Sequence, residues 1–446
     1  MRFSDLEGAS VGVWGAGREI RSFAAQLKRR LSAARITVVA FDSPPSGAEV
    51  EAIADGARVA VGDRVAEALA ECDAIVRSPG VSIHRPEMVK LRERGIPIAT
   101  ATGLWLAEQG GRGVVGFTGT KGKSTTAALA HHLARAAGRN TALAGNIGVP
   151  ALDLLDREPL DLIFLELSSY QIADLSNGPE TAVITNLYHE HLDWHKSERV
   201  YREEKLRIFS LAGVRTAVVN ARDPDLAQAA SGVGRVVLYG EPSGWDCDEV
   251  GVRRAGESMI GVEDLPLPGP HNALNLCAAL SALEVAGIEP PLPDGLAGFT
   301  PLPHRLQVCR ESDGVTWIDD SISTTPESTL AALDAFAGRD VVLLAGGQDR
   351  GQGYTALGAG LARRGAAVVG IPTTGGRAVD AARAAGVPAE RALAAADLAD
   401  AVSIARDLAA PGGVILLSPA APSYDHFRNF EERGERFREL SGARPG

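Results

Sequence analysis

The chain has 446 residues, 23% of them charged, and a formal net charge of −11. A single hydrophobic core stops growing below this length, so two or three domains are expected. The acidic balance disfavours general binding to nucleic acid or to anionic membrane surfaces. Any acidic ligand must therefore meet positive charge that is concentrated locally.

The sequence has none of the usual marks of a secreted or membrane-inserted protein. Its beginning lacks the apolar segment of a signal peptide, and no apolar run approaches the roughly 20 residues that span a bilayer. The cysteines form no C-x-x-C pair, which argues against a disulfide framework or a zinc site; they are Cys72, Cys247, Cys277 and Cys309. We expect a soluble, cytoplasmic, monomeric protein.

Short Val- and Ile-rich runs alternate with longer Ala- and Leu-rich helical patterns along the whole chain. This order predicts an α/β fold with parallel sheets and crossover helices. Strands are expected within residues 9–15, 35–41, 72–80, 113–119, 160–169, 180–187, 215–221, 314–321, 340–347, 365–371 and 412–419. Three doubly wound domains fit this order, over residues 1–108 (Rossmann-like), 109–300 (with a phosphate loop) and 301–446 (Rossmann-like).

The first predicted strand runs into a Gly-rich turn, Gly15 to Ile20. This turn matches the dinucleotide fingerprint G-x-G-x-x-G only in part, because Ile20 stands where the third glycine belongs. Backbone N–H groups at the start of the following helix could hold a diphosphate. A tight turn without a ligand is an equally good interpretation of this stretch alone.

The stretch GTKGKST, Gly119 to Thr125, is the clearest chemical motif. It fails the strict pattern G-x-x-x-x-G-K-[ST] because Phe117 stands at the first glycine position. A buried strand nevertheless leads into it and an Ala-rich helix leaves it, the context in which backbone N–H groups and a helix dipole bind phosphates. Lys123 is placed to reach terminal phosphates, and the Ser124 hydroxyl to bind Mg²⁺. The alternative is a Gly-rich loop that contains Lys and Ser by chance.

Polar side chains follow the next predicted strands of this block. Open α/β sheets bind ligands at these strand ends, and a carboxylate there is a natural Mg²⁺ anchor. Any one of these residues alone could be a cap or a solvated side chain, and we interpret His189 and His195 in that way. The full set is Asn146, then Glu166, Ser168, Ser169 and Gln171, then Asn186, His189, Glu190, His191, Asp193 and His195.

In combination, several motifs resemble those of the Mur ligases of peptidoglycan synthesis. The likeness covers essentially the whole chain and is strongest to the branch that adds glutamate to UDP-N-acetylmuramoyl-L-alanine. The phosphate loop of that family has the form G-[TS]-x-G-K-[ST]-T, which residues 119–125 fit. The resemblance implies an ATP-dependent amide ligase that works through an acyl phosphate. The motifs, in chain order, are GTKGKSTT, GNIG, ELSSYQ, HLDWH, YREEKLRIF, HNALN and PHR.

The resemblance also implies roles in an ATP and Mg²⁺ site. Lys123, His191 and Lys205 would be the catalytic residues. One Mg²⁺ would bind Ser124 and Glu166, and a second would bind His191 and Lys205, a lysine that is commonly carbamylated in this family. The other implied ATP contacts are Gly119, Thr120, Lys121, Gly122, Ser124 and Thr125 of the loop, Asn272, Asn275, Arg305 and Asp320.

The acceptor and the amino acid would bind outside the phosphate loop. The uridine diphosphate is expected at the turn of Gly15, Gly17 and Arg18 and at Ser78, Pro79 and Gly80, with Arg77 as a further nearby cation. The muramoyl-alanine end would meet Asn146, Ser168 and His191. The incoming glutamate would meet Thr324, Arg350, Ser423 and Phe430.

The third domain carries the choice of glutamate enantiomer. D-glutamate ligases typically have a lysine and an asparagine where this chain has Ile322 and Thr325, and a lysine at the position of Arg350. Arginine can hold a carboxylate bidentately, which lysine cannot. These changes favour L-glutamate, with the D-glutamate ligase as the alternative.

Two further alternatives belong to other classes. A folate polyglutamate ligase shares the phosphate loop and the third domain but lacks a separate UDP-binding domain. A P-loop kinase or a non-catalytic nucleotide-binding protein has no evident need of Glu166, His191 and Lys205 together.

Overall fold

The computed structural model describes residues 1–442 except 43, 46, 55, 188–194, 196, 268, 301, 313 and 350. The chain forms two compact units, one of Met1–Leu265 with Leu274–Ala297, the other of Pro266–Ala273 with Gly298–Gly446. Each unit is α/β, and every strand expected from the sequence is present. None of the helices that the described residues form is both long and apolar enough to cross a bilayer.

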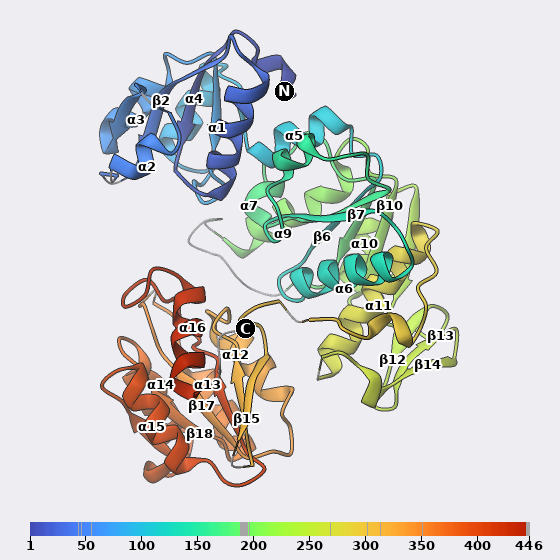
Figure 1. The fold of residues 1–446 in the computed structure, drawn as a ribbon, viewed down its shortest axis with the longest axis vertical. Helices are drawn as coiled ribbons and strands as arrows, with labels where there is room; N and C mark the ends of the chain where they lie inside the picture. The colour runs from blue at the N-terminus through green and yellow to red at the C-terminus, as the bar shows by residue number, and fades with distance from the viewer. Residues whose placement is uncertain are drawn as a thin grey trace. The chain divides into compact units, whose positions relative to one another are not determined.

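The first unit begins with a five-stranded parallel sheet, drawn in blue in Figure 1, with the order β3-β2-β1-β4-β5. Val11 and Val13 of β1 pack against α1 and α5, while Trp14 packs with α3 and α4 on the opposite face. The strand order reverses between β1 and β4, so the turns after these two strands share a ligand-binding edge. The elements are β1 (Ser10–Trp14), α1 (Arg18–Arg30), β2 (Arg35–Phe41), α2 (Gly47–Glu51), β3 (Arg58–Val61), α3 (Val65–Leu69), β4 (Ala74–Arg77), α4 (Pro86–Glu93), β5 (Ile98–Ala99) and α5 (Ala101–Gln109).

A second parallel sheet follows in the same unit, with the order β11-β10-β9-β6-β8-β7. Helix α6 packs across β6, β7 and β8 (Figure 1). The central strand β6 is buried along its whole length, as a strand between neighbours in a covered parallel sheet must be. The elements are β6 (Val114–Thr118), α6 (Lys123–Ala136), β7 (Thr141–Gly145), β8 (Leu162–Glu166), α7 (Ser169–Ile172), β9 (Thr181–Ile184), α9 (Glu198–Leu206), β10 (Thr216–Asn220), α10 (Pro224–Ala230), β11 (Arg235–Tyr239) and α11 (Pro270–Val285).

A small antiparallel sheet that the sequence did not predict lies between β11 and α11. It consists of β12 (Trp245–Cys247), β13 (Gly251–Arg254) and β14 (Glu257–Gly261). Its strands are short and partly polar, so they contain no Val- and Ile-rich run from which they could be predicted. Trp245 Nε1 donates to Glu284 of α11 at 2.9 Å and so ties this sheet to the helix.

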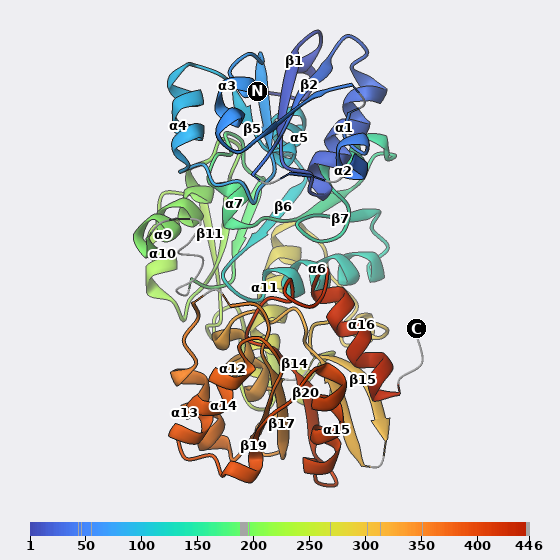
Figure 2. The same cartoon turned by 90° about the vertical axis from the view of Figure 1, so that its left-hand side faces the viewer.

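The second unit contains a six-stranded sheet with the order β15-β16-β20-β17-β18-β19, parallel except for β15 at one edge. Figure 2 shows this sheet between α12 to α14 on one side and α15 and α16 on the other. Leu343 faces the first layer and Leu344 the second, as the two-residue period of a strand requires. The elements are β15 (Gln307–Ser312), β16 (Val315–Asp319), α12 (Pro326–Asp334), β17 (Val341–Ala345), α13 (Thr355–Arg364), β18 (Ala367–Gly370), α14 (Gly375–Ala384), β19 (Ala392–Ala394), α15 (Leu398–Leu408), β20 (Val414–Leu417) and α16 (Phe430–Ser441).

A buried ion pair joins the first two sheets. Arg77, at the end of β4, is fully buried and contacts both carboxylate oxygens of Asp174 at 2.8 Å. Its guanidinium also donates to the carbonyl oxygens of Val81 and Tyr170. Arg77 is thus occupied by protein partners, and its expected place beside the diphosphate stays a prediction.

We expect Asp174→Ala to lower the free energy of unfolding by roughly 3 kcal/mol, because it leaves a buried guanidinium charge without its carboxylate. Urea denaturation followed by circular dichroism measures this change. The exposed pair Arg199–Glu203 supplies the control, since Glu203→Ala should change the stability by less than about 0.5 kcal/mol. Equal losses in the two variants would contradict the prediction.

Candidate active site

The phosphate loop begins where the buried strand β6 ends, and two of its glycines are required by geometry. Gly119 and Gly122 have φ angles of +149° and +79°, and Gly122 is the N-cap of α6. A Cβ atom at Gly119 would lie 1.9 Å from Thr185 Oγ1. The first N–H groups of a helix have no partner within it, so the start of α6 is suited to bind an anion.

The end of β9 holds this loop in place. The N–H of Thr120 donates to the carbonyl of Asn186 at 2.9 Å, and the N–H of Lys121 donates to Asn186 Oδ1 at 2.8 Å. Asn186 Nδ2 and Thr185 Oγ1 both donate to the carbonyl of Lys121. The loop conformation is therefore fixed by four hydrogen bonds from one neighbouring strand end.

Helix α9 contacts the loop from another direction and delivers Lys205 to it. The Nζ of Lys205 donates to the carbonyl of Gly119 at 2.6 Å, and only 2% of this lysine is exposed. Tyr201, one turn earlier, shares a 2.7 Å hydrogen bond with Thr120 Oγ1, and its ring centre lies 4.9 Å from Lys205 Nζ. A lysine that the sequence alone would assign to solvent thus lies beside the phosphate loop.

Glu166 ends β8, the strand beside β6, and has the properties of a metal ligand. It is fully buried, and Asn146 Nδ2 donates to its Oε1 at 3.1 Å. Its Oε2 is buried with no hydrogen-bond partner among the described residues. Such an oxygen is costly unless something binds it, and a divalent cation is a suitable partner.

The remaining residues predicted for ATP in this unit surround the same loop. Ser124 and Thr125 are buried in the first turn of α6, and Lys123 Nζ lies 3.5 Å from the carbonyl of Thr120. Asn275 of α11 contacts the loop, since a Cβ atom at Gly122 would lie 2.2 Å from Asn275 Oδ1. Asn272 stands three residues earlier in the same helix and is also buried, but it belongs to the second compact unit.

Residues predicted for the uridine diphosphate converge at the edge of the first sheet. A Cβ atom at Gly15 would lie 2.8 Å from Ser78 Cβ, and one at Gly17 would lie 3.1 Å from Ser78 Oγ. Pro79 and Gly80 continue this second turn. The two turns therefore touch, and glycine is needed at position 15 also because its φ is +97°.

Arg18 makes contacts that the sequence did not indicate. Its guanidinium donates to the carbonyl oxygens of Gly145, Asn146 and Gly148 at 2.7, 2.9 and 2.8 Å. It therefore holds the loop after β7, which carries Asn146. A diphosphate contact for Arg18 stays a prediction.

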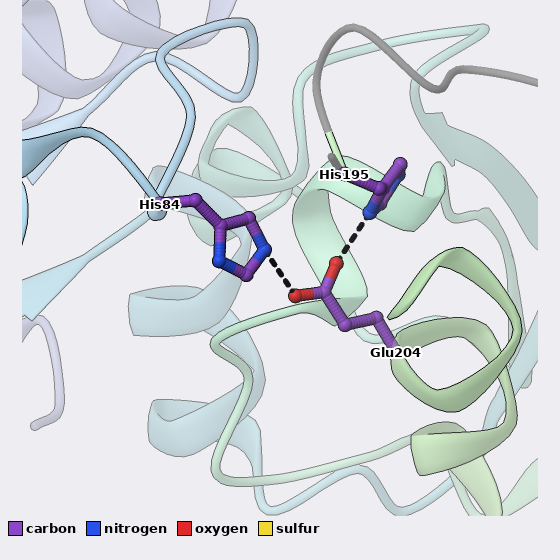
Figure 3. Close-up of side chains that lie close together, drawn as sticks. All are labelled: His84, His195 and Glu204. Carbon is purple, nitrogen blue, oxygen red and sulfur yellow. Dashed lines mark hydrogen bonds and ion pairs between the residues drawn. The ribbon is translucent and has the colours of Figure 1, made fainter. Parts of the chain in front are cut away.

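Figure 3 shows a cluster of three side chains, His84, Glu204 and His195. Glu204 Oε1 lies 2.6 Å from His84 Nε2, and its other oxygen contacts His195 Nδ1. His195 Nε2 lies 2.9 Å from Ser169 Oγ, and the histidine is fully buried. The interpretation of His195 as a cap or a solvated residue was therefore wrong, because its neighbours bond both ring nitrogens.

In the second unit, Asp320 and Arg305 come together. Asp320 is buried and accepts hydrogen bonds from Ser418 Oγ at 2.8 Å and from the N–H of Leu306 at 3.2 Å. Burial raises the pKa of the Asp320 carboxyl to about 6. Arg305 has a buried Nε without a hydrogen-bond partner in the described part of the chain, a donor that would suit an anionic ligand.

Three of the residues predicted for glutamate lie in the same unit. Ser423 is buried, and its Oγ has no hydrogen-bond partner within the described residues. Phe430 begins α16, and its carbonyl accepts a 2.8 Å hydrogen bond from Ser321 Oγ, next to Asp320. Thr324 is partly exposed in the turn before α12.

Two predicted site residues, His191 and Arg350, lie outside the described residues, as do His189, Glu190 and Asp193 of the polar set that follows β9. Sequence reasoning gave no role to Thr185 or Tyr201 and listed Asn186 only among the polar residues at strand ends, although all three hold the phosphate loop. The signal for Tyr201 was its spacing, since it precedes Lys205 by four residues and must share a helix face with it.

We expect Gly122→Ala to weaken nucleotide binding at least tenfold, because the added methyl group collides with Asn275. Gly138→Ala is a matched control: Gly138 follows the same helix with a φ of +77°, but a Cβ atom there meets nothing within 4 Å. Both variants carry the backbone penalty of about 1 kcal/mol. Isothermal titration calorimetry with ATP compares them, and equal affinities would contradict the prediction.

Family comparisons cover most of the chain. The model of the Mur ligase MurD-like N-terminal domain matches residues 13–100, that of the Mur ligase middle domain 117–283, and that of the Mur ligase glutamate ligase domain 304–421. A UDP-N-acetylmuramoyl-L-alanine–L-glutamate ligase from Salinispora tropica is 42% identical, with 98% of each chain covered. Another of that name, from Xanthomonas axonopodis pv. citri, is 40% identical over 100% of this chain and 97% of its own.

Solved structures share the fold at lower identity. UDP-N-acetylmuramate–alanine ligase from Thermotoga maritima is 17% identical, with a TM-score of 0.60 over 97% of this chain and 99% of its own. A bifunctional folylpolyglutamate synthase/dihydrofolate synthase from Yersinia pestis is 19% identical, with a TM-score of 0.56 over 76% of this chain and 92% of its own. The full-length match to curated relatives at 40% identity and above places this chain in the Mur ligase family.

Proposed function

We propose that this chain joins L-glutamate to the alanine carboxylate of UDP-N-acetylmuramoyl-L-alanine in peptidoglycan precursor synthesis, with conversion of ATP to ADP and phosphate. The relatives at 40% and 42% identity over essentially the full length carry this activity in their names. We further propose that it acts in the cytoplasm. The observation that supports the site assignment is that the phosphate loop, the Glu166 oxygen that no described group satisfies and buried Lys205 lie at one edge of the central sheet.

The first chemical step must activate a carboxylate, which is a poor acylating agent. An oxygen of the alanine carboxylate attacks the γ-phosphorus of ATP, the bond from that phosphorus to the β–γ bridging oxygen breaks, and ADP leaves. The product is an acyl phosphate. Both reactants are anions, so positive charge and hydrogen-bond donors must lie between them. Lys123 and the N–H groups at the start of α6 would hold the phosphates.

The second step forms the amide. The nitrogen of glutamate attacks the acyl carbon, the nitrogen loses a proton, and the bond from carbon to the phosphate oxygen breaks. No covalent enzyme nucleophile is needed, so positioning and electrostatics carry the rate. In the second unit, Ser423 Oγ has no hydrogen-bond partner among the described residues, which supports a glutamate site that would also include Thr324, Phe430 and Arg350.

The residues present fit the proposed magnesium site. Glu166 offers a buried oxygen that no described group satisfies, and the Ser124 hydroxyl stands in the first turn of α6. These two would hold one Mg²⁺, while Lys205 and His191 would hold a second. A bound Mg²⁺ supplies charge neutralisation where the carboxylate meets the phosphates.

Two alternatives are less well supported. The names of the relatives specify L-glutamate, which agrees with the changes at Ile322, Thr325 and Arg350. A folate polyglutamate ligase does not account for residues 13–100, which match an N-terminal Mur ligase domain. A plain nucleotide-binding protein leaves the buried Glu166 and Lys205 without a purpose.

The decisive measurement is phosphate release from ATP with UDP-N-acetylmuramoyl-L-alanine and either enantiomer of glutamate. We expect release that depends on L-glutamate and on the acceptor together, with D-glutamate at least a hundredfold less effective. Hydroxylamine should trap the acyl phosphate as a hydroxamate when glutamate is left out. Release with D-glutamate alone would overturn the enantiomer, and release with neither would overturn the ligase assignment.

We also propose that Lys205 carries a carbamate in the active enzyme. The amine would add CO₂ and lose a proton, which replaces an ammonium by a carboxylate-like group that Mg²⁺ prefers. The carbamate retains one N–H, which can still donate to the Gly119 carbonyl that Lys205 Nζ contacts at 2.6 Å. The contact to the loop therefore survives the modification.

Replacing Lys205 by Ala should lower kcat by a factor of at least about 100, and acetate should restore part of the activity. ¹³C NMR of the wild-type protein in labelled bicarbonate should show a carbamate carbon that is absent from the variant. Lys28→Ala, in an exposed turn of α1, is the control and should change neither result. A missing carbamate signal together with no rescue would contradict the modification.

A further inference from the structure

His84, Glu204 and His195 form a cluster that takes no part in the proposed reaction, and they come from three separate segments. His84 lies in the turn between β4 and α4, Glu204 lies in α9, and His195 lies just before that helix. Figure 3 shows the carboxylate of Glu204 between the two imidazole rings. One nitrogen of each ring and a carboxylate oxygen all lie within 4.8 Å of one another.

The chemistry of these side chains suits a zinc ion. Two imidazoles and one carboxylate are a common protein ligand set for tetrahedral zinc, with water in the fourth position. Mg²⁺ prefers oxygen ligands, so the two nitrogens favour zinc over the magnesium that accompanies ATP. The His195 side chain is fully buried, whereas 24% of the His84 side chain is exposed, which leaves an entry path for an ion.

The spacing of the three side chains is close to what such an ion needs. Zinc bonds of about 2.0–2.2 Å at tetrahedral angles place the ligand atoms roughly 3.4 Å apart. Glu204 Oε1 lies 2.6 Å from His84 Nε2, so the carboxylate would have to withdraw by about 1 Å to admit the ion. Glu204 has three rotatable side-chain bonds, which allow a withdrawal of this size without movement of the backbone.

The hydrogen bonds of the cluster can give way to zinc without loss of a proton. A carboxylate only accepts, so with neutral rings His84 Nε2–H and His195 Nδ1–H donate to Glu204, and Ser169 Oγ donates to His195 Nε2 at 2.9 Å. When zinc takes the two ring nitrogens, each hydrogen moves to the other nitrogen of its ring. His195 Nε2–H then donates to Ser169 Oγ, because a hydroxyl can both donate and accept.

The surroundings of His195 orient its ring for this role. Histidine ligands of metal ions almost always donate their second ring N–H to a fixed acceptor, which sets the tautomer and the direction of the ring. Ser169, the first residue of α7, is 3% exposed and supplies that acceptor. The rings of Tyr170 and Tyr201 lie 5.5 and 5.2 Å from the ring of His195, measured between centroids. The ligand is thus held in place before an ion binds.

The cluster is separate from the proposed magnesium sites. Glu204 and Lys205 are consecutive in α9, so their side chains leave the helix about 100° apart. Lys205 Nζ contacts the carbonyl of Gly119, whereas Glu204 contacts the two histidines. An ion in the cluster would therefore use none of the residues that the proposed reaction needs.

We propose that His84, Glu204 and His195 form a zinc site that joins the first domain to the central one. His84 belongs to the segment that follows the turn of residues 78–80, while Glu204 and His195 belong to the segment around α9. One ion would tie these segments together by three bonds. The inference goes beyond the proposed function and is independent of it, because its test uses neither substrate nor turnover.

Titration with cobalt tests the site, because Co²⁺ replaces Zn²⁺ and absorbs visible light strongly only in a tetrahedral environment. The full chain, without a polyhistidine tag and freed of metal by dialysis against a chelator, is titrated with Co²⁺ in excess Mg²⁺, which fills sites made of oxygen ligands. We expect one equivalent to bind with a tetrahedral spectrum and Zn²⁺ to displace it. Zn²⁺ should also raise the temperature of thermal unfolding.

Two variants each remove one ligand. H84A and E204Q should weaken Co²⁺ binding at least about a hundredfold, since even the loss of a group that only orients a ligand costs roughly 10–100-fold. S169A removes such an orienting group, so it should weaken binding about tenfold and keep the tetrahedral spectrum. H426A is the matched control, because His426 lies 3.9 Å from Asp425 in the second unit and outside the cluster. It should bind Co²⁺ as the wild type does.

Thermal unfolding establishes that each variant is folded, and E204Q replaces H84A if H84A does not fold. A wild-type protein that shows no tetrahedral cobalt spectrum would overturn the inference. Unchanged affinity in a folded ligand variant would do the same. A spectrum that is lost in K205A but kept in H84A would assign the ion to the proposed magnesium site, and the zinc site would then be wrong.

Discussion

The arrangement of the site depends on how rigidly the phosphate loop is held. Two anions must approach each other in a chain whose own net charge is −11, and mobile donors would lose much of their effect by reorganising. The loop meets this demand because Asn186 and Thr185 fix its backbone on one side and Lys205 contacts the carbonyl of Gly119 on the other. The positive electrostatic potential at the loop thus comes from groups held by strand ends and a helix, rather than from the net charge of the surface.

The same need for fixed positions explains why side chains of the first domain form hydrogen bonds with the central one. Arg18 and Glu19 are consecutive, yet Arg18 binds the loop of Asn146 and Glu19 binds the helix that Ser168 caps. The proposed acceptor would span both domains, so its two ends would need to be held in a fixed relation. Two directional contacts from one short turn provide that relation more directly than packing could.

Much of the fold could be predicted from the sequence, because buried parallel strands leave Val- and Ile-rich runs that polar loops interrupt. The position of Glu166 at a strand end followed from the same pattern. The antiparallel β12–β14 sheet did not, since its short strands are partly polar. Lys205 was found only through the family resemblance: a lone lysine in a charged helix resembles many solvated ones, and its burial beside Gly119 depends on tertiary packing.

The side-chain partners Gln171 of Glu19, Asp174 of Arg77 and Glu204 of His195 could not have been predicted at all, because they lie 152, 97 and 9 residues away in the chain. Stability does not explain why polar groups occupy this junction, since apolar replacements of buried ion pairs are often as stable or more so. Geometry does. Apolar surfaces tolerate sliding, whereas the bidentate Arg77–Asp174 contact and the four hydrogen bonds of the Gln171 amide each allow one arrangement. The proposed site must align a nucleotide-binding turn with an acylation site, and this single arrangement is what the contacts maintain.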